Sequence, residues 1–289
     1  MTKNTSGKVS GKISVGLIQM SSTGNVAENM LSAESMIRDA AARGAQMVIT
    51  PEMTTLLELD RAALLEKIYF QEDDPSLPKF QALAQELNIW LIIGSMAVKV
   101  KSEAGEKIAN RCFTLSPDGK IVAYYDKIHM FDVDLPDGES YRESRSYAAG
   151  DRAVVVETPL VSLGLSICYD LRFPHLYRLL AQEGAQMITV PAAFTAVTGK
   201  AHWHILLQAR AIENGVFICA AAQTGSHENA RGDVRQTFGH SLFVDPWGNI
   251  IDDGGTNRGV IVAELDLDLV ERARSRIPSL LNDSPFTLN

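Results

Sequence analysis

The chain has 289 residues, of which 46% are hydrophobic, and a formal net charge of −8 at pH 7. This size allows a substantial buried core, and no Pro/Gly/Ser-rich linker divides it, so we expect one domain over 1–289 with a flexible tail at 1–11 and a C-terminal tail at 275–289. The acidic charge argues against a nucleic-acid partner, because phosphate binding requires clustered Lys and Arg, and no apolar run approaches the roughly 18 residues of a membrane span.

The cysteines and the N-terminus indicate a reduced, cytoplasmic protein. The three cysteines, at 112, 168 and 219, are odd in number and widely spaced, so they suggest neither a disulfide framework nor a metal cluster. The first twelve residues lack the apolar core of a signal peptide.

Strand-like and helix-like segments alternate through the first half of the chain. Short apolar runs predict buried strands, and apolar residues at helical spacing predict the helices between them. The predicted strands are 12–20, 45–51 and 89–98, and the predicted helices are 25–44 and 75–88. Asp118-Gly119 between two apolar runs then predicts a β-hairpin over 111–127.

The alternation resumes in the second half. It predicts buried strands at 164–167, 186–193 and 216–223 and helices at 174–184 and 201–214. The last two apolar segments, 240–254 and 259–268, are expected to form an antiparallel pair. This order predicts a mixed α/β fold with helices over a largely buried sheet.

Two stretches of the sequence are near copies of each other. GAQMVITPEM at 44–53 and GAQMITVPAA at 184–193 each contain a glycine, a short apolar run and a proline. A fold with two similar halves would produce this echo. Since Glu52 in the first copy is matched by Ala192 in the second, the architecture does not itself require a carboxylate there.

Four segments place reactive groups at predicted strand ends or in loops. They are TPEM with Glu52, YDKIHMFD with Lys127, YRESRSY with Glu143 and SICYD with Cys168. Taken singly, each has a structural interpretation, because a cysteine in a buried strand is more often a small core residue and charged residues are common in loops.

Together the four residues fit one chemical scheme. A thiol needs a base to become a thiolate nucleophile, and Glu52 could take the proton if a desolvated pocket raised its pKa. Lys127 and the backbone N–H of Tyr169 could stabilise the oxyanion formed when Cys168 attacks a carbonyl carbon, and Glu143 could position the Lys127 ammonium. None of the six histidines can be assigned as a base from the sequence.

The other candidates are weighed in the same way. Phe194 and Thr195 follow the proline of the second copy and are expected to line a pocket. Arg172, four residues past the nucleophile, is a candidate anchor for a substrate carboxylate, with a structural ion pair to Asp170 or Glu143 as the alternative. Cys112 and Cys219 are interpreted as core residues.

These motifs resemble the nitrilase superfamily of carbon–nitrogen hydrolases. The resemblance runs from VGLIQM to FGHSLFVDPWGNII, and CYDLRFP, KIHMFD and ESRSYAAGD are its most specific segments. It implies that Glu52, Lys127 and Cys168 form a Glu-Lys-Cys catalytic set and that Glu143 matches the family's second glutamate. It also implies an α-β-β-α sandwich that dimerises to α-β-β-α-α-β-β-α through helices near the nucleophile, with no cofactor and no metal.

Within the superfamily, FDVDLPDGESYRESRSYAAGD and PAAFTAVTGKAHWHILLQARAIEN resemble the branch of deaminated glutathione amidases and of the nitrilase half of NitFhit proteins. This implies a small amide substrate, deaminated glutathione first, cleaved through a cysteine thioester with release of ammonia. An ω-amidase acting on α-ketoglutaramate, an N-carbamoyl hydrolase and a true nitrilase stay open, as does a catalytically inert binding or scaffold protein. Asp126, where an arginine commonly precedes the catalytic lysine, and His175, where a glutamate commonly follows RFP, depart from the family pattern.

Overall fold

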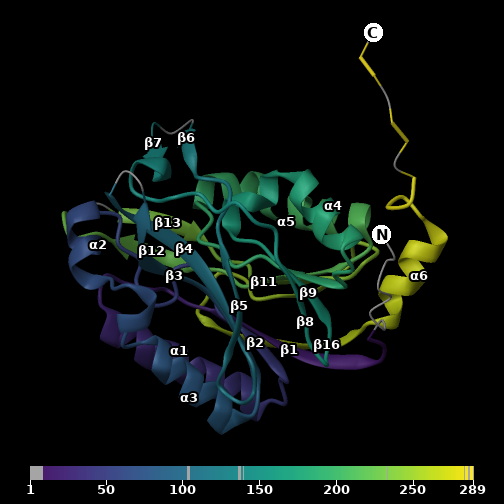
Figure 1. The fold of residues 1–289 in the computed structure, drawn as a ribbon, viewed down its shortest axis with the longest axis horizontal. Coiled ribbons are helices and arrows are strands. Elements are labelled where there is room, and N and C mark those ends of the chain that lie inside the picture. Colours follow the sequence, from purple (N-terminus) through teal and green to yellow (C-terminus); the bar gives the residue numbers. More distant parts are fainter. Residues whose placement is uncertain are drawn as a thin grey trace.

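Two six-stranded β-sheets pack against each other at the centre of the molecule (Figure 1). The computed structural model describes residues 9–102, 105–135, 138, 140–232, 234–282, 284–285 and 287–288. The largest core cluster joins side chains of both sheets, among them Leu17 and Ile49 of the first and Leu163 and Ile188 of the second. The central strands of both sheets are therefore buried on both faces, which explains their continuous apolar sequences.

The first sheet is formed mainly by the N-terminal half of the chain. In spatial order its strands are β16 (Gly259–Asp266), β1 (Lys12–Gln19), β2 (Met47–Ile49), β3 (Trp90–Ser102), β4 (Gly105–Leu115) and β5 (Ile121–Asp126). The strands β1, β2 and β3 are parallel, whereas β16, β4 and β5 join them as antiparallel neighbours.

The second sheet has a similar plan. Its strands are β15 (Ile250–Asp253), β14 (Leu242–Val244), β11 (Phe217–Ala220), β10 (Met187–Thr189), β9 (Ser162–Leu165) and β8 (Val155–Glu157). The central three, β9, β10 and β11, are again parallel. Ligand sites of such sheets form outside the carboxyl ends of the parallel strands, and this is where the candidate residues lie.

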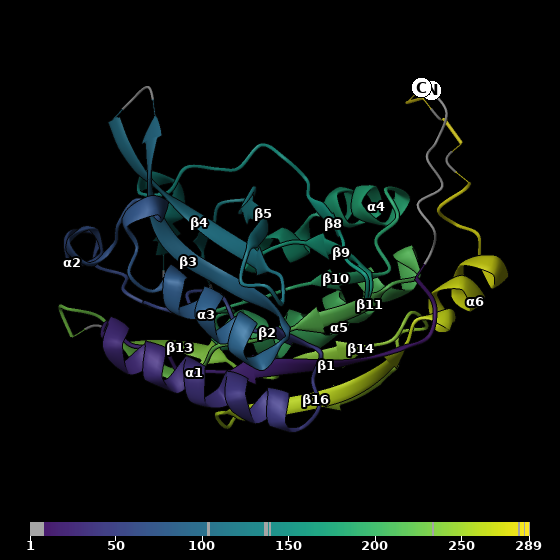
Figure 2. The same ribbon diagram turned by 60° about the horizontal axis from the view of Figure 1, so that its bottom comes forward.

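Helices cover the outer face of each sheet, which confirms the expected α-β-β-α sandwich (Figure 2). On the first sheet these are α1 (Val26–Ala42) and α3 (Leu77–Leu87), and on the second α4 (Pro174–Gln182) and α5 (Ala196–Asn214). In α1 the Asn25 side chain caps the first turn, accepting from the Ala27 and Glu28 amides. Ala33, Ile37 and Ala40 follow at helical spacing and form its buried face.

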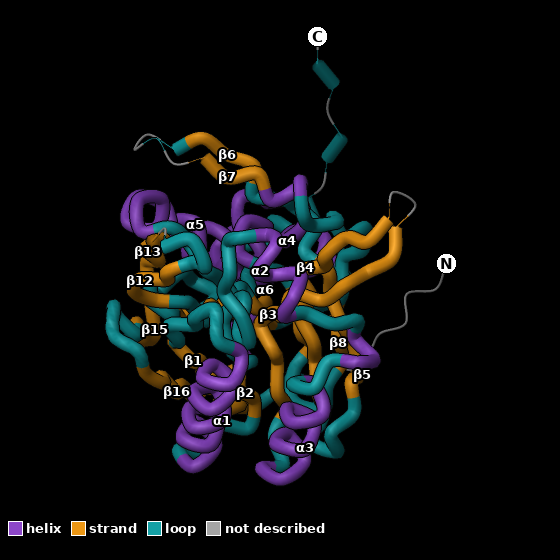
Figure 3. The backbone as a smooth tube through the Cα atoms, turned by 90° about the vertical axis from the view of Figure 1, so that its left-hand side faces the viewer, coloured by secondary structure: helices purple, strands orange, loops and turns teal. Residues whose placement is uncertain are grey.

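Smaller elements complete the fold. They are α2 (Arg61–Lys67), α6 (Asp268–Arg276), and the short helices η1 (Gln71–Asp73), η2 (Glu143–Arg145) and η3 (Cys168–Arg172). Two hairpins stand outside the large sheets, β6 (Asp132–Asp134) with β7 (Ser140–Arg142), and β12 (Thr224–Glu228) with β13 (Val234–Phe238) (Figure 3).

The hairpin expected at Asp118-Gly119 is confirmed, since β4 and β5 pair antiparallel and Gly119 has a φ of 76°. The pairing expected between 240–254 and 259–268 is wrong. The first of these segments forms its own hairpin, β14 with β15, while β16 crosses to the other sheet and pairs with β1. Both sides of β14 are already occupied, by β11 and β15, whereas the outer edge of β1 has room for a partner.

In the structure, ordered contacts extend into both segments that were predicted to be tails, 1–11 and 275–289. Val9 packs on the core and its carbonyl accepts a bond from Gln186, while residues 1–8 lie outside the described part. At the other end, α6 extends through Arg276, and Ser279 bonds to Arg178 and Glu213. None of the helices that the structure describes has the length and apolar composition of a transmembrane span.

Candidate active site

The predicted catalytic residues converge on one cavity of about 460 Å³. Glu52, Lys127, Glu143 and Cys168 all line it, together with Tyr169. Glu52 follows β2 and Cys168 follows β9, so the two sheets contribute one residue each from the carboxyl ends of their parallel strands. The volume falls in the usual range for a small-molecule site.

Cys168 sits at a sharp turn that presents its side chain to the cavity. Its φ is +48°, a left-handed conformation that is costly for a residue with a Cβ and is common at functional sites. Its backbone N–H donates to the Pro191 carbonyl at 2.9 Å, which fixes the turn to the end of β10. Tyr169 follows in the first turn of η3, where an amide has no helical carbonyl partner, so its N–H is free of the helix ladder.

Asp170 ties the turn at Cys168 to the segment that carries Lys127. The carboxylate is fully buried and accepts from Tyr125 Oη at 2.6 Å, from the Ile167 amide at 2.9 Å and from the His129 amide at 3.0 Å. His129 Nδ1 lies 2.7 Å from the same carboxylate. Sequence reasoning missed this role of Asp170, although an acidic residue two positions past the nucleophile was visible.

Lys127 bridges two carboxylates. It follows β5, its Nζ lies 3.2 Å from Glu52 Oε1 and 2.8 Å from Glu143 Oε2, and it is almost completely buried. Burial alone would lower the pKa of Lys127, but the charges of Glu143 and Glu52 raise it well above its usual value. The ammonium is therefore permanently charged. Glu143 is itself held by the Phe131 amide at 2.6 Å.

Hydrogen-bond donors surround the Glu52 carboxylate. Its Oε1 accepts from Asn110 Nδ2 at 2.9 Å and faces Lys127, and its Oε2 accepts from the Ala193 amide at 2.8 Å. Burial favours the neutral acid, but the charge of Lys127 and a hydrogen bond from Cys168 outweigh it, so the pKa of Glu52 is lowered. The expectation of a raised pKa is wrong for this reason, and Glu52 is ionised and ready to accept a proton.

The Cys168 thiol is neutral at rest. Burial and the nearby charge of Glu52 raise its pKa well above 9.0, although Lys127 acts in the opposite direction. Because the thiol donates to a carboxylate that is already ionised, removal of its proton is most favourable when it accompanies attack on an electrophile.

The candidate binding residues divide into two groups. Phe194 and Thr195 line the cavity, where Thr195 caps α5. Arg172 is not among the described residues that line it. Its guanidinium lies 3.3 Å from His202 Nδ1 and over the Phe194 ring at 5.3 Å, so it makes neither of the ion pairs considered as alternatives.

Two residues of the site were not predicted from the sequence: Asn110, which bonds to Glu52, and Arg235, which lines the cavity. Asn110 is a fully buried polar residue in β4, a signal that becomes visible only once β4 is known to be internal. Arg235 lies on β13 in a polar stretch, RGDVRQTF, that has no motif-like feature.

The two departures from the family pattern have local explanations. Asp126 makes a fork-like ion pair with Arg111, across β4 and β5, with both N–O distances at 2.7 Å. A cation at position 126 is thus replaced by a cation on the neighbouring strand. His175 is exposed and meets His129 and Phe173 edge to face.

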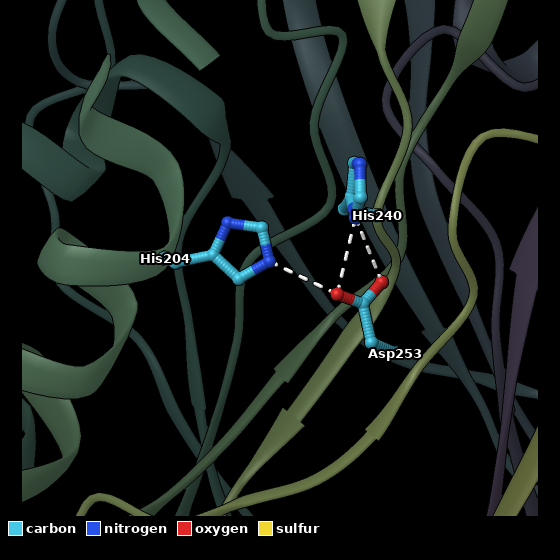
Figure 4. Close-up of side chains that lie close together, drawn as sticks. All are labelled: His204, His240 and Asp253. Carbon is cyan, nitrogen blue, oxygen red and sulfur yellow. Dashed lines mark hydrogen bonds and ion pairs between the residues drawn. The ribbon is translucent and has the colours of Figure 1, made fainter. Parts of the chain in front are cut away.

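A cluster of His204, His240 and Asp253 lies outside the cavity lining (Figure 4). His204 Nε2 is 3.0 Å and His240 Nδ1 is 2.9 Å from the Asp253 carboxylate. Two imidazoles and a carboxylate are a donor set that divalent transition metals accept. One nitrogen of each imidazole lies within hydrogen-bond distance of an Asp253 oxygen. The network holds His240, whose φ is +57°, between α5 and β15.

The sequence matches the carbon–nitrogen hydrolase family over residues 14–275. The chain belongs to this family. It is 41% identical over 266 residues to the deaminated glutathione amidase of Synechocystis, covering 91% of this chain and 95% of that protein. It is 34% identical to the omega-amidase NIT2 of Homo sapiens, with 91% and 92% covered. The crystal structure of the Caenorhabditis elegans NitFhit protein superposes with a TM-score of 0.85 at 36% identity, covering 95% of this chain and 65% of that chain. The protein is therefore a hydrolase of carbon–nitrogen bonds other than peptide bonds, with amidases among its relatives.

Proposed function

We propose that this hydrolase cleaves a small amide through a thioester on Cys168. The observation that carries the proposal is that Glu52, Lys127 and Cys168 line one cavity, in which Glu52 Oε1 lies 3.2 Å from Lys127 Nζ and Glu52 Oε2 accepts from the Ala193 amide. A base, a nucleophile and a cation thus meet in one cavity, in the arrangement that nucleophilic acyl transfer requires.

The reaction takes two steps. Cys168 Sγ attacks the amide carbon while Glu52 accepts the thiol proton, and the Lys127 ammonium and the Tyr169 N–H stabilise the oxyanion. Glu52 then gives the proton to the departing nitrogen, and the C–N bond breaks to leave the acyl thioester. In the second step Glu52 takes a proton from water, the hydroxide adds to the thioester, and the Cys168 thiol is regenerated with its proton as the carboxylic acid leaves.

Deaminated glutathione is the first substrate that we propose, on the strength of the 41% identical relative. In that compound the amide nitrogen belongs to a cysteinyl residue, so the leaving group is a peptide amine, and the expected release of ammonia applies to simple ω-amides instead. An ω-amide such as α-ketoglutaramate is the second candidate, because omega-amidase NIT2 is 34% identical over most of both chains.

The deciding experiment compares these substrates in wild type and in Cys168→Ala. Hydrolysis is followed by chromatographic detection of the carboxylic acid product, which serves every leaving group. Wild type should cleave an amide in preference to the matched nitrile and N-carbamoyl compound, and Cys168→Ala should be inactive. Cys219→Ala, a buried cysteine in β11, is the matched control and should remain active. Turnover by Cys168→Ala at the wild-type rate would end the thioester proposal.

An inert scaffold predicts a different behaviour of the thiols. All three cysteines are buried and their pKa values are raised, but only Cys168 lines the cavity among them. Iodoacetamide should therefore label Cys168 before Cys112 and Cys219, with a rate that depends on Glu52 as the base. Equal labelling of the three thiols would favour the scaffold.

We further propose a cytoplasmic, single-domain homodimer joined through α4 and α5. These two helices pack together on the outer face of the second sheet and leave apolar side chains exposed, including Leu179, Ile205 and Ile212. Sedimentation of wild type should give a dimer, and Ile205→Lys should shift the equilibrium toward the monomer. A wild-type monomer at micromolar concentration would contradict this assembly.

A further inference from the structure

The cavity contains an arginine that the catalytic scheme does not use. Arg235 lies on β13, opposite His227 of β12 in the hairpin, and lines the cavity together with Cys168 and Ala193. One of its terminal nitrogens donates to the Ala193 carbonyl, and the guanidinium lies over the Tyr141 ring at 5.2 Å from its centroid. The side chain is thus held in place from two directions.

Most of the donors of Arg235 are not used by the described residues. A guanidinium has five N–H groups, and Nε is fully buried without a hydrogen-bond partner in the part of the chain that the structure describes. No carboxylate of the described residues lies within ion-pair distance of it. A buried, unpaired N–H of a charged group is unfavourable, and a carboxylate ligand would satisfy it with a two-point contact.

The other cations around the cavity are already engaged or lie at its margin. Lys127 is bound by Glu52 and Glu143. Arg142 makes two bonds to Asp134, at 2.7 and 2.9 Å. Arg61 is the first residue of α2 and is exposed. Among the described cavity residues, Arg235 is therefore the half-buried cation with donors to spare, and its Nε is fully buried.

The position of Arg235 limits the length of its ligand. Ala193 donates its N–H to Glu52 and accepts from Arg235 through its carbonyl. The Glu52 carboxylate and the Arg235 guanidinium thus bond to the same residue, and the charge of Arg235 helps to lower the pKa of Glu52. A substrate that reaches both needs only a short aliphatic chain between its amide and its second polar group. Leu57, Leu64 and Phe194 offer apolar surface for that chain.

We propose that Arg235 is the specificity residue that binds a carboxylate on the acyl side of the substrate. This inference rests on the proposed amidase function and replaces Arg172, which lies outside the cavity lining, as the anchor. The local positive charge also explains how a chain with a net charge of −8 can accept an anion.

The test uses two substrates with the same acyl chain, glutaramate and its methyl ester. Wild type is compared with Arg235→Met, Arg235→Lys and Arg172→Met. Met keeps the length of the stem but removes the charge. In Arg235→Met the KM for glutaramate should rise about 10- to 100-fold, while the KM for the neutral ester amide should change far less. The comparison is made on KM because the charge of Arg235 also lowers the pKa of Glu52 and so affects kcat on both substrates. The KM of Arg235→Lys for glutaramate should lie between those of wild type and Arg235→Met, because lysine keeps the charge but cannot make the two-point contact. Arg172→Met should leave the ratio of the KM values for the two substrates unchanged.

Binding of glutarate, measured by titration calorimetry, separates this inference from the amidase proposal. Wild type should bind glutarate and Arg235→Met should not, whether or not either substrate is turned over. No hydrolysis of either amide by wild type would reject the amidase proposal alone. Equal rises in KM for the two substrates, a selective rise in Arg172→Met, or glutarate binding retained in a folded Arg235→Met would each overturn the role of Arg235. If Arg235→Met does not fold, Arg235→Lys provides the test, through its KM for glutaramate relative to its KM for the methyl ester.

Discussion

The two near copies in the sequence, 44–53 and 184–193, occupy equivalent places in the two sheets but present different groups to the cavity. Each begins at a glycine with positive φ, Gly44 or Gly184, after α1 or α4. Each then enters a central parallel strand, β2 or β10, and ends at a proline. The hydrogen bonds match as well: the Gln46 amide donates to the preceding strand at 2.8 Å, and so does that of Gln186.

The copies differ in the groups that they present after the proline. The first presents the Glu52 carboxylate, whereas the second presents backbone groups: the Pro191 carbonyl accepts from the Cys168 amide, and the Ala193 amide donates to Glu52. Gly94 of β3 lies where the copies meet, since a Cβ there would be 1.9 Å from the Thr50 carbonyl and 2.6 Å from Pro191. The shared pattern thus builds the fold, and the difference between Glu52 and Ala192 gives a carboxylate to one copy only.

Removing the carboxylate from the first copy should have the largest effect. Glu52→Gln keeps the shape of the side chain but cannot accept the thiol proton, so kcat/KM should fall by about 10²–10⁴-fold. Steady-state kinetics on the best amide measures this. Glu86→Gln, at a surface ion pair with Arg38, is the control and should be neutral. Wild-type kinetics in Glu52→Gln would remove Glu52 from the mechanism.

Making the second copy resemble the first should cost stability. Ala192 is fully buried, and its amide donates to the Ala221 carbonyl, so Ala192→Glu buries a charge with no cation of its own. The free energy of unfolding should fall by about 3–5 kcal/mol, as urea denaturation would show. Ala192→Ser should lower the free energy of unfolding by less than Ala192→Glu does.

A carboxylate in the second copy should not replace the one in the first. Lys127 and Asn110 both contact Glu52, and a carboxylate at 192 would have to reach them from the opposite sheet. The double variant Glu52→Ala/Ala192→Glu should therefore remain inactive. Recovered activity would mean that the two positions are interchangeable.

Removing the cation tests why the first copy can hold a charge. Lys127→Met should lower kcat by about 10²–10³-fold through loss of an oxyanion partner. The acid limb of the profile of kcat/KM against pH should also move to higher pH, because Lys127 lowers the pKa of Glu52. Lys120→Met, at an exposed pair with Asp118, is the matched control. An unshifted acid limb would contradict the electrostatic role of Lys127.

The smallest expected effect is on acid stability. Because the pKa of Glu52 is lowered in the folded state, its stabilising contribution is complete above the unfolded-state pKa of about 4.3 and is lost as pH falls through the folded-state value. Between about pH 5 and 3 the free energy of unfolding of Glu52→Gln should therefore fall less than that of wild type. If the free energy of unfolding fell more steeply in the variant than in wild type, the pKa of Glu52 would not be lowered in the folded state.

The elements of the fold, and the residues proposed as catalytic that line the cavity, could be predicted from the amino-acid sequence alone. Apolar runs and turn residues act locally, so the central strands and the β4–β5 hairpin could be read from neighbouring positions. The segments around Glu52, Lys127 and Cys168 were also sufficient to indicate a family, because their chemistry is recognisable in short stretches. The near copies even indicated the two matching halves.

The way in which those residues act on one another became visible only in three dimensions. The lowered pKa of Glu52 depends on Lys127, which is 75 positions away in the chain. The partner of β16 is β1, at the other end of the sequence. Arg172 was the anchor that the sequence suggested, whereas Arg235, in a stretch with no motif-like feature, was noticed only once the residues that line the cavity were known. Local patterns record propensity and burial, whereas electrostatics and pairing depend on distances in space, which a chain position does not contain.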